Sequence, residues 1–230
     1  MLKELREQVL EANLELVRRG LVLYTFGNAS GIARAEGLVA IKPSGVPYEG
    51  MRPEDLVIAD LDGRIVEGTL RPSSDLPTHV ALYRAFKGIG GVVHTHSRYA
   101  TSWAQARRPI PCLGTTHADY FRGPVPVTRP MSPAEIDSAY EASTGDVIAA
   151  HFAGGDPLEV PAVLVAGHGP FCWGLSAADA AHNAVILEYV AEMAYYSVTL
   201  SDAAEELHPA HLDKHFLRKH GVSAYYGQRG

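Results

Sequence analysis

The spacing of hydrophobic residues predicts helices at both ends of the chain. Over residues 2–19 apolar positions recur at intervals of three and four, and Gly20 follows, which is typical of a helix and its stop signal. Ser176 and Asp179 form a helix-start signal before an Ala-rich segment that runs to about residue 200. Further helices are expected over 77–87, near 98–106, from the capping-box pattern at 132–135, and over 209–220.

Short apolar runs between these helices predict strands. They fall at 32–34, 38–41, 56–59, 65–66, 91–96 and 162–166, whereas the Gly- and Ser-containing residues 27–31 are expected to form a loop. Asp62-Gly63, between two of these runs, indicates a hairpin. Terminal helices around hairpin-connected strands predict a single α/β domain over residues 1–230, with a largely antiparallel or mixed sheet.

Composition and charge narrow the classes of function. Hydrophobic residues make up 47% of the 230 residues, the net charge is −6, and no basic block is present, so a nucleic-acid partner is not expected. No apolar run approaches the roughly 18 residues of a membrane span, and the first residues are expected to form an amphipathic helix rather than a signal peptide. The two cysteines, Cys112 and Cys172, form no disulfide framework and favour a cytoplasmic location.

Two histidines end the apolar run at residues 91–96. Alternate side chains of a strand share a face, so His94 and His96 would lie about 7 Å apart at Cα and could bind one metal ion. The alternative is an ordinary strand end. His168 follows another apolar run, and three histidine ligands leave an open coordination position, which is typical of a catalytic metal. Nitrogen ligands suit Zn²⁺, with Co²⁺ or Mn²⁺ as alternatives.

Asp75 is the acidic candidate for the same centre. It is suited to bind the metal or to act as a nearby base. The alternative is that its side chain caps the helix expected from Pro77, and the two roles are compatible.

Three polar loops contain residues suited to binding a phosphate. Their small residues let backbone N–H groups approach an anion, their hydroxyls add donors, and Lys42 would supply positive charge. No loop matches a nucleotide-binding fingerprint, and each one taken singly is also compatible with an ordinary turn. The candidate residues are Gly27, Asn28, Ser44, Gly45, Ser73 and Ser74.

Read together, these stretches resemble the class II aldolase family, which includes the adducin head. The matching segments follow one another along nearly the whole chain: Gly27-Asn28-Ala29-Ser30, Ile41-Lys42-Pro43-Ser44-Gly45, the segment 72–79 around Ser73-Ser74-Asp75, His94-Thr95-His96-Ser97, the segment 114–120 around Asp119, Gly167-His168-Gly169-Pro170, and the ending 217–228. The resemblance implies a three-layer α/β/α domain around a largely antiparallel sheet. It also implies a homotetramer with active sites at subunit interfaces.

The same resemblance implies residue roles. His94, His96 and His168 would bind the metal, with Asp75 on it or beside it, and the loop residues with Lys42 would bind substrate. Asp119 and Tyr226 are implied as the two proton-transfer residues, and the tail, residues 221–230, would reach a neighbouring subunit's site. Thr115, Glu141 and His215 are implied as supporting residues.

The implied activity inverts C4 of a pentulose phosphate, interconverting L-ribulose 5-phosphate and D-xylulose 5-phosphate by cleavage and re-formation of the C3–C4 bond. Two alternatives are a sugar-phosphate aldolase of the L-fuculose-1-phosphate type and a non-catalytic scaffold of the adducin-head type. Family aldolases look like Ser-Ser-Glu where this chain has Ser73-Ser74-Asp75, which favours the epimerase. The scaffold is disfavoured because every metal-ligand position is filled.

Overall fold

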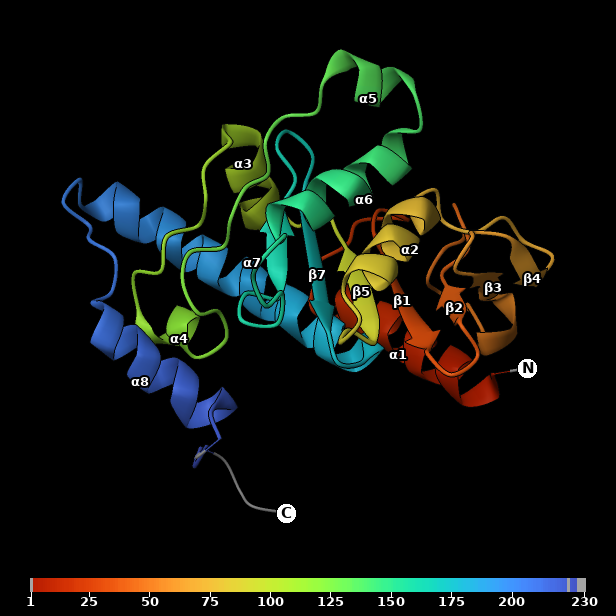
Figure 1. Ribbon diagram of the computed structural model, residues 1–230, viewed down its shortest axis with the longest axis horizontal. Coiled ribbons are helices and arrows are strands. Elements are labelled where there is room, and N and C mark those ends of the chain that lie inside the picture. The colour runs from red at the N-terminus through yellow and green to blue at the C-terminus, as the bar shows by residue number, and fades with distance from the viewer. Residues whose placement is uncertain (1, 223, 227–230) are drawn as a thin grey trace.

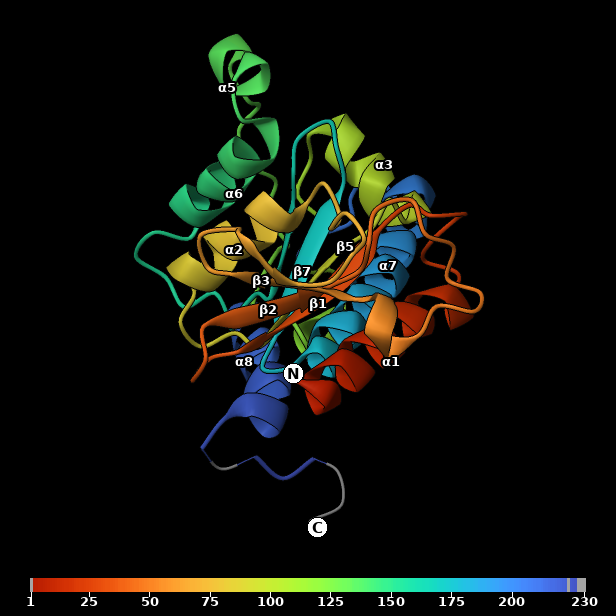
Figure 2. The ribbon, with the colours of Figure 1, turned by 90° about the vertical axis from the view of Figure 1, so that its right-hand side faces the viewer.

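A central sheet organises the computed structural model, which describes residues 2–222 and 224–226. Its seven described strands lie in the order β4-β3-β2-β1-β5-β7-β6, and every neighbouring pair is antiparallel (Figure 1, Figure 2). The expected α/β architecture around a largely antiparallel sheet is confirmed. The strands are β1 (Asn28–Ala33), β2 (Leu38–Ile41), β3 (Val57–Asp60), β4 (Ile65–Glu67), β5 (Gly91–His94), β6 (Ala162–Leu164) and β7 (Pro170–Gly174).

Helices cover both faces of this sheet. α1, α3 and α7 pack on one face, and α2 and α6 pack on the other (Figure 2). The helices are α1 (Lys3–Arg18), α2 (Leu76–Ala85), α3 (Arg98–Ala106), α4 (Thr115–Ala118), α5 (Pro133–Asp137), α6 (Tyr140–His151), α7 (Ala177–Leu200) and α8 (Pro209–His220), with a short 3-10 turn at Pro53–Asp55.

Strand residues alternate between two hydrophobic cores. On β2, Ala40 belongs to the core shared with α1 and α7, whereas Val39 and Ile41 belong to the core shared with α2 and α6. Successive side chains of a strand point to opposite faces, and on β2 both faces are buried. The sheet therefore forms the middle layer of an α/β/α arrangement.

Residues 28–31, expected to form part of a loop, instead form the first part of β1. Asn28 pairs with His94 of β5, and Gly31 pairs with Gly91. A small residue is required because α1 packs directly on the strand, so that a Cβ on Gly31 would lie 2.8 Å from Val9 Cγ2. The glycine therefore indicates close packing of a helix on a strand rather than a turn.

The strand expected over 91–96 ends at His94, and the chain then turns into α3, so that His96 lies beyond the sheet. The strand expected over 162–166 ends at Leu164, and the chain returns as β7, which the apolar pattern did not indicate. α4 and α6 were also missed. β7 is only five residues long and begins at a proline, so it carries little local signal.

Two helices project from the layered body. α5 stands above α6, and α8 lies beside α4 toward the chain terminus (Figure 1). Among the described residues, none of the helices combines the length and the apolar character needed to cross a bilayer.

Candidate metal centre and active site

Three adjacent strands bring two of the predicted histidines to one end of the sheet. His94 is the last residue of β5, and its strand partners are Asn28 at the start of β1 and Phe171 in β7. His168 lies in the turn before β7, where Gly167 has a φ of +76°. Because β5 and β7 are antiparallel, the end of one strand and the start of the next meet at the same edge.

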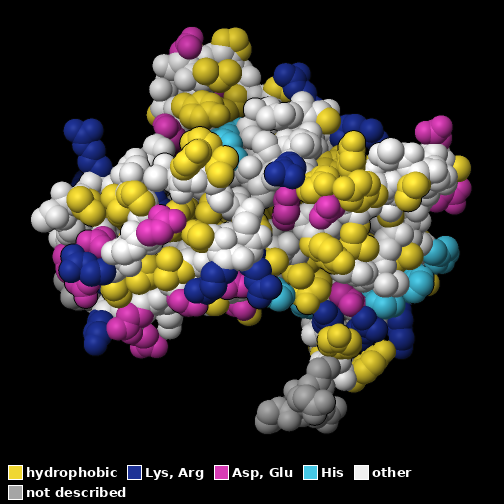
Figure 3. Space-filling model, turned by 180° about the vertical axis from the view of Figure 1, so that it is seen from behind, with side chains coloured by type: hydrophobic (Ala, Val, Ile, Leu, Met, Phe, Trp, Pro, Cys, Tyr) yellow, Lys and Arg dark blue, Asp and Glu magenta, His cyan; other side chains and the backbone are white. Residues whose placement is uncertain are grey.

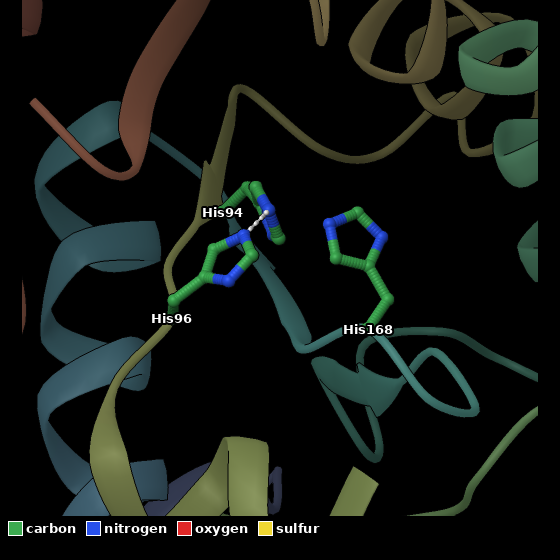
Figure 4. Close-up of side chains that lie close together, drawn as sticks. All are labelled: His94, His96 and His168. Atoms are coloured by element: carbon green, nitrogen blue, oxygen red, sulfur yellow. Dashed lines mark hydrogen bonds between the residues drawn. The ribbon is translucent and has the colours of Figure 1, made fainter. Parts of the chain in front are cut away.

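The three imidazoles converge on one point. One ring nitrogen from each of His94, His96 and His168 lies within 4.8 Å of the other two, and the Nε2 atoms of His94 and His96 are 3.1 Å apart. Figure 4 shows the three rings facing a common space. No other group of three such donors occurs in the described part of the chain. The structure thus brings together the three side chains that the sequence predicted to share a metal ion.

The protonation of these histidines favours metal binding. The Nδ1 atom of His94 lies 2.9 Å from the Pro170 carbonyl oxygen, so Nδ1 carries the hydrogen and the Nε2 lone pair is available to a cation. Burial lowers the pKa of His94 to about 3, and it lowers the pKa of His96 and of His168 as well. Neutral imidazole is the form that binds a divalent cation, so this donor set fits one.

Asp75 lies in the same cavity as the histidines but outside the group of three nitrogen donors. Its Oδ2 accepts a 2.6 Å hydrogen bond from Asn28 Nδ2. Burial opposes ionisation of Asp75, yet His94 and His79 and the Asn28 amide lower its pKa overall. The side chain makes no capping bond to α2, so the helix-cap alternative is not what the structure shows.

A row of buried polar contacts fixes α2 against β1 behind Asp75. Ser30, two residues after Asn28 along β1, contacts His79 Nδ1 at 2.7 Å and the Tyr83 hydroxyl at 2.8 Å. His79 and Tyr83 follow Asp75 at intervals of four along α2, so all three lie on one side of the helix. These contacts set the register of the helix on the strand and thereby the position of the Asp75 carboxylate.

The histidines border a cavity of about 390 Å³. Its lining includes Glu141, one of the predicted supporting residues. It also includes Thr25, Phe26 and Tyr140, which the sequence analysis did not predict. The single sequence signal for Tyr140 is its position next to Glu141. Every residue predicted to bind substrate lines the cavity: Gly27, Asn28, Lys42, Ser44, Gly45, Ser73 and Ser74.

Backbone hydrogen bonds hold two of the polar loops side by side. Ser44 N donates to Arg71 O, and Ser73 N donates to Lys42 O, each at 2.9 Å. Gly45 has a φ of +67°, which favours glycine. The result is a rim of small and hydroxyl-bearing residues, which suits an anionic group of a ligand.

Lys42 is buried beneath this rim, with 1% of its surface exposed. Its Nζ donates to Val46 O at 2.7 Å and to Pro43 O at 3.2 Å, and it lies 4.6 Å from the centroid of the Tyr48 ring. An ammonium has three donors, and these two bonds use two of them. Burial lowers the pKa of Lys42 to about 8.

The two predicted proton-transfer residues lie together, but neither lines this cavity. The Asp119 carboxylate accepts hydrogen bonds from Arg218 at 3.0 and 2.6 Å and contacts His215 Nδ1 at 3.0 Å. The Arg218 guanidinium also lies 4.8 Å from the centroid of the Tyr226 ring, and Lys219 Nζ lies 4.6 Å from it. We call these five residues the Asp119–Tyr226 cluster.

This cluster lies where α4 and α8 meet. Thr115, one of the three predicted supporting residues, begins α4, and its carbonyl accepts a 2.9 Å bond from Asp119 N. Viewed from behind, basic and histidine side chains gather over α8 (Figure 3). Burial opposes ionisation of Asp119, but the bonds from Arg218 and His215 lower its pKa overall. One chain therefore presents the metal centre and this cluster as two separate groups.

Known proteins resemble this chain in sequence and in fold. The class II aldolase and adducin N-terminal domain family matches residues 7–195. The L-ribulose-5-phosphate 4-epimerase UlaF of Salmonella paratyphi B (strain ATCC BAA-1250 / SPB7) is 52% identical over 228 residues, which cover 99% of this chain and 100% of that protein. A solved L-fuculose 1-phosphate aldolase has a TM-score of 0.78 at 24% identity, covering 92% of this chain and 94% of its own. The L-fuculose-1-phosphate aldolase of Thermus thermophilus has a TM-score of 0.68 at 26% identity, covering 88% of this chain and 98% of its own.

Proposed function

The chain belongs to the class II aldolase and adducin N-terminal domain family, and from that premise we propose that it is a metal-dependent epimerase that interconverts L-ribulose 5-phosphate and D-xylulose 5-phosphate. The observation that carries the proposal is the 52% identity, over 99% of this chain, to a protein named for that reaction. The convergent group of His94, His96 and His168 supports it, because a metal-dependent reaction needs such a donor set.

Inversion at C4 of a 2-ketopentose phosphate cannot start by simple deprotonation, because the C4 hydrogen is not adjacent to the carbonyl, and we propose that the C3–C4 bond breaks instead. Cleavage gives a three-carbon enediolate and glycolaldehyde phosphate, and rotation of the aldehyde before the bond re-forms inverts C4. The rim around Ser44, Gly45, Ser73 and Ser74 would hold the phosphate, so that the aldehyde turns without leaving the cavity.

The histidines and Asp75 would hold the cation in this reaction. When bound, a divalent cation supplies Lewis-acid stabilisation of the negative charge that develops on substrate oxygens. We propose Zn²⁺, because three neutral imidazoles suit it, and the same donors also accept Co²⁺ or Mn²⁺. Asp75 would serve as a ligand or as a carboxylate beside the ion, with Asn28 fixing its orientation.

Two acid–base groups are required, one for each configuration of the C4 hydroxyl, and we assign these roles to Asp119 and Tyr226. Both lie in the Asp119–Tyr226 cluster, outside this chain's own cavity. We therefore propose a homotetramer in which the cluster and the tail, residues 221–230, of one subunit complete the cavity of its neighbour. Residues 223 and 227–230 of that tail lie outside the described residues.

We further propose that residues 1–230 form a single domain in the cytoplasm. Cys112 and Cys172 are both free and buried. Free buried thiols suit a reducing compartment, where disulfides do not form.

Incubation of the Zn²⁺-loaded protein with L-ribulose 5-phosphate tests the proposed reaction. D-xylulose 5-phosphate is the expected product. Net release of dihydroxyacetone and glycolaldehyde phosphate would instead indicate an aldolase, and a parallel incubation with L-fuculose 1-phosphate is expected to give no cleavage. Absence of turnover with either sugar phosphate would reject both enzymatic functions.

The Lys42→Met variant is expected to bind substrate more weakly. Its kcat/KM is also expected to lose the decrease at high pH that the wild type should show. A charge-assisted hydrogen bond to the phosphate is worth about 1.5–3 kcal/mol, so KM should rise roughly 10- to 100-fold. Because burial places the Lys42 pKa at about 8, the ammonium is present below that pH and is lost above it. We therefore expect wild-type kcat/KM to fall above pH about 8, as initial rates across pH would show.

The matched control for this prediction is Lys87→Met, since Lys87 is exposed and does not line the cavity. That variant should retain the wild-type KM and pH profile. If Lys42→Met also retained both, Lys42 would have no part in phosphate binding.

A further inference from the structure

The third histidine of the metal centre lies on a turn and not on the sheet. The position of His94 is fixed by β5, and the orientation of its ring is fixed by the Pro170 carbonyl. His168, in contrast, precedes β7 in a turn that the bond from Val165 N to Gly169 O closes at 2.9 Å. Strand pairing therefore does not orient the His168 ring, and another contact is needed to aim its nitrogen at the ion.

A tyrosine of α6 makes that contact. The Tyr140 hydroxyl oxygen lies 3.3 Å from the Nδ1 atom of His168, and the two ring centroids are 6.1 Å apart. No second hydrogen bond to the His168 ring is found within residues 2–222 and 224–226. Figure 4 shows one nitrogen of His168 turned toward His94 and His96 and the other turned away from them.

The start of α6 is itself held in place. Thr144 Oγ1 donates to the Tyr140 carbonyl at 2.8 Å, and Thr78 Oγ1 of α2 donates to the Glu141 carbonyl at 2.5 Å. Thr78 lies about one turn after Asp75, so α2 positions both the Asp75 carboxylate and the first turn of α6. These bonds therefore fix the position of the Tyr140 backbone next to His168.

The chemistry of a metal-binding histidine determines which atom is the donor and which is the acceptor in this contact. A histidine that binds a cation through Nε2 carries its hydrogen on Nδ1, and that hydrogen needs an acceptor. The Pro170 carbonyl fills this role for His94. For His168 the acceptor available at Nδ1 is the Tyr140 hydroxyl oxygen.

We propose that Tyr140 is a positioning residue for the metal ligand His168. Its hydroxyl accepts the Nδ1 hydrogen and so turns the Nε2 lone pair toward the point that His94 and His96 share. The proposal rests on the metal centre of the proposed function, and it adds to that centre a residue that acts on the ion only through His168.

The test is the Zn²⁺ affinity of Tyr140→Phe, measured by competition with a chromophoric chelator. Loss of a hydrogen-bond partner behind a metal-binding histidine typically weakens metal affinity about 10- to 100-fold, and we expect that range here. The ring remains, so the unfolding temperature of the metal-free protein should not change. Turnover should fall at limiting Zn²⁺ and recover at saturating Zn²⁺.

Tyr189→Phe is the matched control, because Tyr189 is exposed on α7 and does not line the cavity. It should bind Zn²⁺ like the wild type. Equal affinities for Tyr140→Phe and wild type would overturn the proposal, as would a loss of metal-free stability without a change in affinity. Absence of Zn²⁺ binding by the wild type would reject the metal centre itself, and this inference with it.

Discussion

The His96→Ala variant is expected to lose its metal and its catalysis together. In the wild type, the Nε2 atom of His96 lies 3.1 Å from the Nε2 atom of His94. Removal of the His96 side chain leaves two histidines, whereas catalytic zinc centres use three protein ligands. Lewis-acid stabilisation is worth several kcal/mol, and each 1.4 kcal/mol or so is about tenfold in rate, so turnover should fall roughly 10³-fold or more. Elemental analysis after dialysis and the rate with L-ribulose 5-phosphate measure the two losses.

His96 is an informative position because its loss should leave the fold intact. The side chain lines the cavity beyond the end of β5, outside both hydrophobic cores. The control is His151→Ala, which removes an exposed histidine from the last turn of α6 and should keep metal and activity. A His96→Ala protein with full metal content and full activity would remove His96 from the set of ligands.

The Tyr226→Phe variant is expected to turn over about 10²–10⁴-fold more slowly, the usual effect of losing a general acid–base group. The side chain is 60% exposed, and its ring lies beside Arg218 and Lys219. Phenylalanine keeps these ring contacts, so stability and KM should change little while kcat falls. Steady-state kinetics on the two proteins make the comparison.

A tyrosine outside the tail provides the control for this variant. Tyr195 is 48% exposed on α7 and does not line the cavity, so Tyr195→Phe makes the same chemical change away from the proposed site. It should retain wild-type kcat. Near-normal kcat in Tyr226→Phe would exclude Tyr226 as a proton carrier.

A mixture of the two inactive variants tests whether subunits share sites. In a mixed assembly, a His96→Ala subunit still supplies Tyr226, and a Tyr226→Phe subunit still supplies the three histidines. If the tail completes a neighbour's cavity, mixing and reassembly should restore part of the activity. If each chain completed its own cavity, every site in the mixture would stay inactive, and the shared-site proposal would be wrong.

Local spacing was sufficient to predict most of the elements. The helix over 2–19, the hairpin around Asp62-Gly63 and the Ala-rich helix from Ser176 all match elements of the structure, with ends that differ by a residue or two. Each of these depends on neighbours within about four residues, which the sequence shows directly. The prediction of a loop was wrong at residues 28–31, which begin β1. There a glycine is required at position 31 because α1 packs Val9, a residue distant along the chain, against the strand.

The candidate site likewise has features that the sequence predicted and features that only the structure shows. The candidate metal ligands His94, His96 and His168 and the loops that line the cavity could be predicted, because their chemistry depends on residue type and short motifs. Asp75 was readable as an acid, but its hydrogen bond to Asn28 was not, because the two residues are 47 positions apart.

By itself, the sequence was sufficient to predict the class of fold, the three histidines of the candidate metal centre and the loops that line the cavity. Only the tertiary structure decided that Tyr140 contacts His168, and that Asp119 lies with Arg218 rather than in the cavity. The physical reason is that local hydrogen bonding and side-chain chemistry are encoded over a few residues. Contacts across 28 or 99 positions, in contrast, depend on how the helices pack on the sheet and on one another.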